Sequence, residues 1–192
     1  MVKTGELQAQ KSQLRKLLKE RRKQIGAGER RRISNGIVKQ LTQLKDYKKA
    51  EIIFCYIGIA EEIDTIPLIQ DAWKKGKRVG VPRCTGKGEM TVYEIHQLSD
   101  LKPGNYGILE PEQTLPAILP ESIDLALVPC ISCSSNGVRL GYGGGYYDRY
   151  LPGISGKKLA LCSQDMMCEE IPKEDHDCEM DGVVTEKFAI FC

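Results

Sequence analysis

The part of this sequence that says most about its fold reads Arg139-Leu140-Gly141-Tyr142-Gly143-Gly144-Gly145-Tyr146-Tyr147-Asp148-Arg149-Tyr150-Leu151, with four glycines in five positions. Glycine tolerates positive φ angles and weakens both helices and strands, so these residues predict a loop. The backbone amides of such a loop can form an anion-binding nest, and a helix beginning at Tyr146 would add its N-terminal dipole. The alternative is a glycine-rich hairpin with stacked tyrosines.

The charged residues of this stretch favour anion binding. Asp148 could hold a divalent cation beside a bound phosphate, and Arg139 and Arg149 could neutralise further charge. Two common phosphate loops are excluded. A Walker A loop needs Lys and then Ser or Thr where Tyr146 and Tyr147 stand. The pattern G-x-G-x-x-G, begun at Gly141, needs its third glycine at position 146 and finds Tyr146 there. The stretch therefore predicts a phosphate-binding loop of another kind, with its own metal ligand.

Length and composition favour one intracellular domain. The chain has 192 residues, of which 41% are hydrophobic, so we expect a single domain over residues 1–192. Its longest apolar run, residues 52–60, is far shorter than the roughly 20 residues that a membrane helix needs. Residues 1–10 show no signal sequence. Eight cysteines without an export signal indicate reduced thiols, and we expect a cytoplasmic protein.

Cys130 and Cys133 form a C-x-x-C pair, which could bind zinc or take part in redox chemistry. A structural zinc site requires two further ligands at a suitable spacing. The other cysteines and the two histidines form no second pair of this kind. We therefore expect buried thiols at these two positions.

The charges are distributed unevenly along the chain. Residues 1–49 carry 15 Lys and Arg but only 4 Asp and Glu, whereas the whole chain has a net charge of only +2. A basic arm on an acidic body suggests an anionic ligand, such as a nucleotide, a nucleic acid or a polycarboxylate. The alternative is an ordinary solvated helix face.

Hydrophobic periodicity predicts helices alternating with strands. Helices are expected at 7–25, 29–44, 67–75 and 146–151. Strands are expected at 51–59, 78–82, 90–95, 123–129, 157–162 and 187–191, and residues 103–111 are expected to be a loop. This order indicates a three-layer α/β domain on which the basic helices of residues 1–45 pack.

The glycine loop and its flanks, Arg-Leu-Gly-x-Gly-x-Gly-Tyr-Tyr-Asp-Arg from Arg139, resemble the signature of the 5-formyltetrahydrofolate cyclo-ligase family, also called methenyltetrahydrofolate synthetases. The resemblance covers almost the whole chain. It implies a mostly parallel mixed sheet, related in topology to sugar-phosphate isomerase and CoA-transferase folds. It also implies the Mg²⁺- and ATP-dependent conversion of 5-formyltetrahydrofolate to 5,10-methenyltetrahydrofolate, through phosphorylation of the formyl oxygen and attack by N10.

The resemblance further implies roles for single residues. Lys11 and Arg15 match a Lys-x-x-x-Arg motif that contacts ATP, whereas Arg21, Arg22 and Lys23 are expected to contribute little. The implied ATP-binding residues of the loop are Arg139, Leu140, Gly141, Tyr142, Gly143, Gly144, Gly145, Tyr146 and Tyr147. The implied catalytic residues are Arg139, Tyr146, Asp148 and Arg149, and the implied Mg²⁺ ligands are Asp148 and Asp175.

For the folate, the turn Glu62-Ile63-Asp64-Thr65 matches a family motif whose glutamate binds the substrate, so Glu62 would accept the pterin's N–H donors. Ile57 matches a position that packs on the pterin, and Tyr106 matches an aromatic residue near the substrate. The loop residues that would touch folate as well as ATP are Tyr142, Gly143, Gly144, Gly145 and Tyr146.

The sequence departs from the family at two places. Some members carry a basic residue where Tyr142 and Gly144 stand, and Arg149 or Arg83 could substitute in stabilising the transferred phosphoryl group. The expected partners are ATP and a reduced folate, with or without a polyglutamate tail. We expect a monomer, no nucleic acid and no membrane. The rival interpretations are a nucleotide- or nucleic-acid-binding module without catalysis, and a sugar-phosphate- or CoA-handling protein of the same fold.

Overall fold

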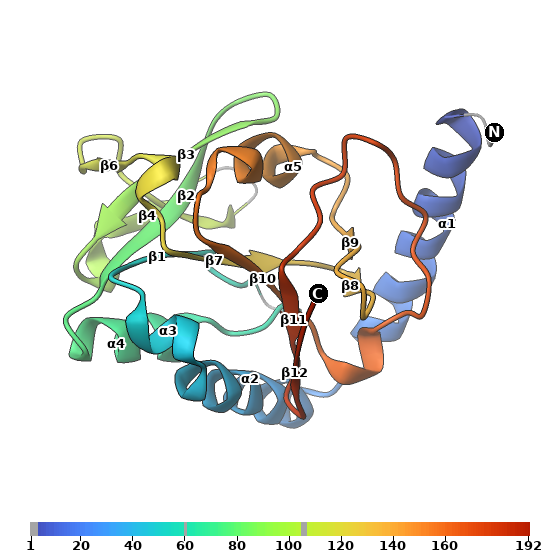
Figure 1. Cartoon of the computed structure of the whole chain (residues 1–192), viewed down its shortest axis with the longest axis horizontal. Helices are drawn as coiled ribbons and strands as arrows, with labels where there is room; N and C mark the ends of the chain where they lie inside the picture. The colour runs from blue at the N-terminus through green and yellow to red at the C-terminus, as the bar shows by residue number, and fades with distance from the viewer. Residues whose placement is uncertain (1–3, 60, 105–106) are drawn as a thin grey trace.

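The computed structural model describes residues 4–59, 61–104 and 107–192. Its centre is an eight-stranded sheet in the order β12-β11-β10-β7-β1-β2-β3-β6 (Figure 1). The neighbours from β11 to β2 are parallel, and β12, β3 and β6 pair antiparallel at the edges. These strands are β1 (Ile52–Cys55), β2 (Arg78–Gly86), β3 (Glu89–Ile95), β6 (Ala117–Ile118), β7 (Leu125–Pro129), β10 (Lys157–Leu161), β11 (Gly182–Val184) and β12 (Ala189–Phe191). The mixed, mostly parallel sheet is the one expected.

Helices lie on both sides of the sheet. Helices α2 (Ala27–Gln43), α3 (Lys45–Lys49) and α4 (Ile66–Lys74) cover one face, whereas α1 (Thr4–Lys23) and α5 (Tyr146–Tyr150) lie on the other side (Figure 1). Successive side chains of a strand point to opposite faces. Accordingly, two separate buried clusters form, one on each face of the sheet. The predicted three-layer α/β architecture is thus confirmed.

The two faces are visible in the central strands. Ile53 of β1 and Leu125 of β7 belong to the cluster under α2 and α4, whereas their neighbours Phe54 and Ala126 belong to the opposite cluster. Leu18 of α1 is buried in this second cluster at 3% exposure. Helix α1 therefore packs against the body through its apolar side chains. Most of its basic side chains lie at the surface, but Lys11 is buried.

The first strand is shorter than expected. It ends at Cys55 rather than at residue 59, because the chain then turns away from the sheet. The carbonyl of Tyr56 accepts a hydrogen bond from the Thr65 hydroxyl at 2.5 Å, which closes this turn on itself. The residues after β1 are thereby directed to the carboxyl edge of the parallel strands, where α/β proteins bind ligands.

The expected loop at residues 103–111 was partly wrong. β4 (Leu101–Pro103) pairs antiparallel with β5 (Leu109–Pro111), as β8 (Ser132–Cys133) does with β9 (Arg139–Leu140). Strands of two or three residues are too short for a period of two to appear in the sequence. Both small hairpins matter because each leads into the candidate site.

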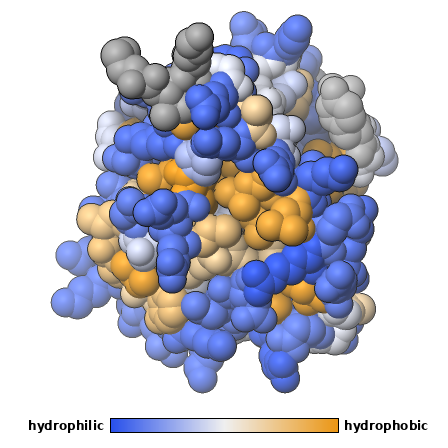
Figure 2. Space-filling view, turned by 90° about the vertical axis from the view of Figure 1, so that its right-hand side faces the viewer, coloured by the Kyte–Doolittle hydropathy of each residue, from blue (hydrophilic) through white to orange (hydrophobic). Residues whose placement is uncertain are grey.

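The surface at the end of the molecule that carries α1 is mostly hydrophilic, interrupted by hydrophobic patches (Figure 2). Helices α1 and α2 occur where periodicity predicted them, within a few residues at each end. None of the helices in the described part of the chain is long and apolar enough to cross a membrane.

Candidate active site

A cavity of about 650 Å³ opens at the carboxyl ends of β1 and β7, beside the glycine loop. Five segments surround it: α1, the residues after β1, the strands β2 and β5 with their surroundings, the chain from Arg139 to Asp148, and the turn at residues 174–177. Several of these segments are far apart in the sequence and meet only here. The cavity is the natural place to look for a substrate, because it is large enough for a drug-sized ligand.

The glycine loop has the backbone that an anion cradle requires. Gly143 and Gly145 have φ angles of 99° and 68°, a region that other residues rarely adopt. Within the described chain, we find no hydrogen-bond acceptor for the N–H groups of Gly143, Gly144 or Gly145. These amides are therefore free to bind a ligand, and α5 begins directly after them, at Tyr146, as predicted.

Asp148 is held by an ion pair. Its Oδ1 accepts a hydrogen bond from Arg139 Nη2 at 2.8 Å and another from the Cys178 N–H at 3.4 Å. The Arg139 side chain is only 3% exposed and also donates to the carbonyl of Pro129, while its Nε is buried without a hydrogen-bond partner among the described residues. The second carboxylate oxygen of Asp148 has no partner among the described residues and remains available to a metal ion.

Lys11 is buried and lies between two carboxylates. Its Nζ donates to Glu174 Oε2 at 2.9 Å and also to Asp177 Oδ2. The hydrogen bond from Lys11, together with its charge, lowers the pKa of the Glu174 carboxyl. For Asp177, burial acts to raise the pKa, but the Glu174 N–H and Lys11 outweigh it, and the net shift is downward. Both carboxylates are therefore ionised at neutral pH.

The turn that carries these carboxylates contains the only group of potential metal ligands found in the described residues: Glu174, His176 and Asp177, whose ligand atoms lie within 4.8 Å of one another. All three line the cavity, and Glu174 Oε1 is buried without a hydrogen-bond partner. Asp175 is exposed and does not line the cavity, so the structure brings its neighbours to the site instead. The sequence pattern located the turn, but it could not tell which acidic side chains face inward.

Helix α1 carries a row of cations beside the glycine loop. Arg15 Nε donates to the carbonyl of Gly141 at 2.8 Å, so the Lys-x-x-x-Arg motif is in direct contact with the glycine loop. Arg22, about two turns further along the same face, donates to the hydroxyl of Tyr142 at 2.6 Å. The expectation that Arg22 matters little is thus not supported by its position. The signal that sequence reasoning missed is the spacing of residues 11, 15, 18 and 22, which forms one helical stripe.

Much of the remaining lining of the cavity is apolar. It includes Ile57, Pro82, Met90 and Leu109, together with the carboxylates of Glu62 and Glu110. Glu62 Oε2 accepts the N–H of Ile59 at 3.0 Å, which fixes the carboxylate at the start of the turn after β1. Ile57 and Glu62, which the sequence predicted to bind the folate, thus both line this cavity. Tyr106 lies outside the described residues.

Two predicted arginines occupy bracing positions away from the cavity wall. Arg149 Nη1 donates to the carbonyls of Gly88 and Gly144, both at 3.2 Å, and so ties the glycine loop to the β2–β3 turn. Arg83 donates to the carbonyl of Pro111 and lies 4.0 Å from the buried Glu110 carboxylate. Neither arginine lines the cavity, whose lining includes the cations Lys11, Arg15 and Arg139.

The cysteines of the C-x-x-C pair are buried free thiols, as predicted, with 4% exposure at Cys130 and none at Cys133. The Cys130 thiol donates to the carbonyl of Leu161 at 3.2 Å. The adjacent Cys162 thiol, together with the charges of Arg22 and Arg139, lowers the pKa of Cys130 in spite of burial.

An α/β sheet that carries a glycine loop, buried lysine and clustered carboxylates at its carboxyl edge has the parts of an ATP-dependent enzyme. The sequence model of the 5-formyltetrahydrofolate cyclo-ligase family matches residues 7–186, and the chain belongs to this family of ATP-dependent ligases. The chain is 28% identical to the mouse 5-formyltetrahydrofolate cyclo-ligase, with 90% of this chain and 92% of the mouse protein covered. It is 26% identical to the *Escherichia coli* K12 enzyme of the same name, with 88% and 96% covered.

Solved structures give the same result. The solution structure of *Aquifex aeolicus* 5,10-methenyltetrahydrofolate synthetase superimposes with a TM-score of 0.85 at 33% sequence identity, covering 94% of this chain and 92% of that one. A *Mycoplasma pneumoniae* 5,10-methenyltetrahydrofolate synthetase superimposes with a TM-score of 0.75 at 20% identity, which supports the fold. The predicted family is therefore confirmed.

Proposed function

We propose that this protein closes the ring of 5-formyltetrahydrofolate to 5,10-methenyltetrahydrofolate, using ATP and releasing ADP and phosphate. The observation that carries the proposal is that one cavity is lined by two unlike sets of residues, which we assign to two ends. One set has free loop amides, cations and carboxylates, and the other is mostly apolar with the carboxylates of Glu62 and Glu110. The first suits a nucleotide's phosphates, and the second suits an aromatic heterocycle with N–H donors.

At the phosphate end, the amides of Gly143 to Gly145 and two cations of α1 bind the triphosphate. Lys11 has three donors, of which its two carboxylate partners take two, so a third can reach a phosphate oxygen. Arg15 uses Nε for the Gly141 carbonyl and keeps its two terminal nitrogens for the ligand. Arg139 acts mainly on Asp148, which it orients through a buried ion pair.

The carboxylates at this end suit a hard cation. Asp148 has one carboxylate oxygen without a partner, and Glu174 has another, which is buried. The two residues are also linked through the backbone, because Cys178, which follows the turn that carries Glu174, donates its N–H to Asp148. Mg²⁺ prefers such oxygen ligands and usually binds through one or two carboxylates plus the substrate phosphates. The metal would neutralise charge on the phosphate oxygens. On this arrangement Asp148, Glu174 and Asp177 would hold the ion, in place of the expected Asp175; Glu174 and Asp177 belong to the ligand group of the turn, whereas Asp148 lies outside that group.

At the folate end, Glu62 accepts hydrogen bonds from the pterin's amino and ring N–H groups, while Ile57 packs on the ring. The carboxylate is already fixed by the Ile59 N–H, so binding costs little reorganisation. Tyr142 to Tyr146 line the same cavity as Lys11 and Glu62, so this stretch of the loop can contact both substrates. The formyl oxygen and the γ-phosphate would therefore meet beside this loop.

The chemistry requires positioning more than covalent catalysis. The formyl group on N5 is an amide, and its oxygen is a poor leaving group. Transfer of the γ-phosphoryl group to this oxygen gives an imidate phosphate and ADP. N10 then attacks the activated carbon and loses its proton, the carbon–oxygen bond breaks, and inorganic phosphate leaves with the electron pair.

The test is direct. Purified protein incubated with 5-formyltetrahydrofolate and Mg-ATP should produce the methenyl chromophore and ADP in a 1:1 ratio. Omission of any one of the three components should abolish the product. ATP hydrolysis without methenyl formation, or tight salt-dependent binding of DNA or RNA in its place, would overturn the proposal in favour of a nucleotide- or nucleic-acid-binding protein.

A further inference from the structure

Arg22 links three separate parts of the chain around the candidate site. From the last turn of α1, its Nη2 donates to the carbonyls of Cys130 at 2.7 Å and Ile131 at 2.9 Å. Its Nη1 donates to the hydroxyl of Tyr142, and its guanidinium also lies over the Tyr142 ring, 6.0 Å from the centroid. One side chain therefore fastens the end of β7 and the glycine loop to the same helix.

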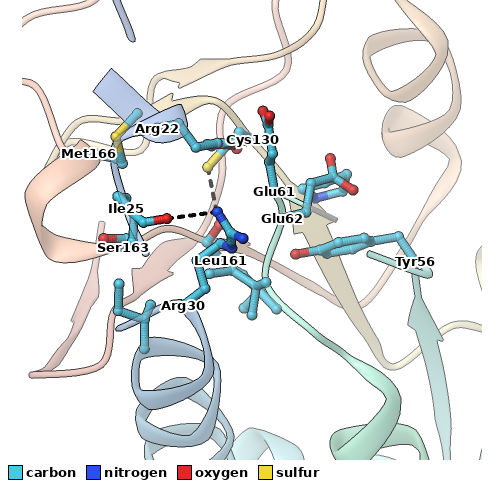
Figure 3. A pocket seen from close by; sticks show the side chains of 13 residues that line it. Arg22, Ile25, Arg30, Tyr56, Glu61, Glu62, Cys130, Leu161, Ser163 and Met166 are labelled. Carbon is cyan, nitrogen blue, oxygen red and sulfur yellow. Dashed lines mark hydrogen bonds between the residues drawn. The ribbon is translucent and has the colours of Figure 1, made fainter. Parts of the chain in front are cut away.

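Tyr142 shares the large cavity with Glu62 of the folate end. Desolvation of the hydroxyl, followed by the negative charge of Glu62, raises the pKa of Tyr142, so the hydroxyl is protonated while it accepts from Arg22. Arg22, Cys130 and Glu62 also line a second, small cavity of about 30 Å³, in which they converge from three segments (Figure 3).

The hydroxyl of Tyr142 matters because little else fixes the start of the glycine loop. Tyr142 itself is 40% exposed and is flanked by Gly141 and Gly143. The flanking glycines have no side chains with which to pack, and glycine loses more conformational freedom on ordering than any other residue. In the described structure, the side-chain hydrogen bonds to this part of the loop come from Arg15 and Arg22, both on α1.

We propose that Arg22 is a positioning residue for the reaction: through the Tyr142 hydroxyl and the carbonyls after β7 it holds the start of the glycine loop in the cavity that Glu62 also lines, and so fixes the folate end of the cavity relative to the phosphate end. This inference rests on the proposed function. Arg22 touches neither substrate, and each substrate can still bind its own end without it. Loss of Arg22 should therefore lower kcat more than it raises either KM, because the reacting oxygen and phosphorus are held less well in line.

A double-mutant cycle separates this role from simple support of the fold. Arg22→Ala removes all three hydrogen bonds, whereas Tyr142→Phe removes only the hydroxyl. Each variant should lower kcat about tenfold, which corresponds to about 1.4 kcal/mol, and the double variant should lose no more than the worse single one. The thermal midpoint should fall for Arg22→Ala, which leaves two carbonyls without their donor, but hardly for Tyr142→Phe. Arg21→Ala, an exposed neighbour on α1, is the matched control and should behave as wild type.

A second readout does not depend on catalysis. Limited chymotrypsin digestion should cut after residue 142 faster in Arg22→Ala and in Tyr142→Phe than in wild type, with Arg21→Ala unchanged. Multiplicative losses of kcat in the double variant, a Tyr142→Phe enzyme with wild-type kcat, or unchanged cleavage after residue 142 would each overturn the inference. Failure of the wild-type protein to form the methenyl product would overturn the proposed function instead, and the cleavage rates would still decide the role of Arg22 in ordering the loop.

Discussion

Asp148→Asn is the substitution with the most to reveal, because the structure gives this carboxylate two partners. The change keeps the size of the side chain and removes its charge. It should weaken the proposed Mg²⁺ site, and it should also leave the buried guanidinium of Arg139 without its counter-ion, which now lies 2.8 Å away. The ion pair therefore predicts a loss of stability in addition to the loss of metal binding.

The size of the stability loss follows from burial. The Arg139 side chain is 3% exposed and that of Asp148 is 21% exposed, so the pair is intermediate between an exposed and a buried one. Exposed pairs contribute about 0–1 kcal/mol, whereas removing one partner of a buried pair costs about 3–5 kcal/mol. We therefore expect Asp148→Asn to lower the free energy of unfolding by about 2 kcal/mol. For a chain of this length, that loss corresponds to a fall of about 4–8 °C in Tm.

The matched variant is Arg139→Gln, which breaks the same ion pair but keeps the carboxylate. Both variants should show a lower Tm by thermal denaturation. In steady-state assays at varied Mg²⁺, Asp148→Asn should raise the half-saturating Mg²⁺ concentration at least tenfold, or about 1.4 kcal/mol, whereas Arg139→Gln should leave it close to wild type. An unchanged Mg²⁺ dependence in Asp148→Asn, or an equal shift in both variants, would refute the assignment of Asp148 as a metal ligand.

Three further predictions concern the remaining walls of the cavity. Lys11→Ala should raise the KM for ATP far more than the KM for folate. Lys11 holds the pKa of Glu174 below its ordinary value of 4.5, so the stabilisation of the fold by this ion pair is present at neutral pH and is lost as the pH falls through the lowered pKa. Because the variant lacks the ion pair, its free energy of unfolding should depend less on pH below about 4.5 than that of wild type. Glu62→Gln should weaken folate binding by about 1.5–3 kcal/mol, the usual contribution of a hydrogen bond to a charged group, and calorimetry should find the ATP affinity nearly intact; weakened ATP binding would show that the two ends are assigned the wrong way round. Gly144→Val should fold normally by circular dichroism but lose ATP binding and cyclisation together, because a β-carbon there would lie 2.8 Å from the Tyr146 ring and beside the free amides; cyclisation near the wild-type rate would leave only a hairpin with stacked tyrosines.

Local features of the fold could be predicted from the sequence because they depend on residues close together in the chain. The positive φ angles at Gly143 and Gly145 and the helix beginning at Tyr146 follow from glycine's freedom and from the residues after it. The two long N-terminal helices were found from their apolar spacing. The early end of β1 could not be found in this way, because it depends on Thr65 bonding back to the Tyr56 carbonyl nine residues earlier.

Residues of the candidate site could be predicted where a motif marks a single position. They could not be predicted where several adjacent residues of the same charge could fill the same role. Lys11, Glu62 and Asp148 all line the cavity, as the motifs indicated. Among the adjacent acidic residues of the turn at 174–177, however, Glu174 and Asp177 are turned inward by contact with Lys11, which lies more than 160 residues away in the sequence. Arg22 was grouped with its basic neighbours, although its spacing from residues 11, 15 and 18 separates it from them. The predicted likeness to sugar-phosphate isomerase and CoA-transferase topologies stays a prediction.

The most direct measurement of the central claim follows one oxygen atom. If the γ-phosphoryl group is transferred to the formyl oxygen and leaves with it, 5-formyltetrahydrofolate labelled with ¹⁸O in the formyl group should give inorganic phosphate that carries one ¹⁸O per methenyl product formed. Mass spectrometry of the phosphate after a single turnover with Mg-ATP in unlabelled water decides the question. Phosphate that contains no ¹⁸O while the methenyl product accumulates would contradict phosphorylation of the substrate, and would mean that the ATP is hydrolysed by water.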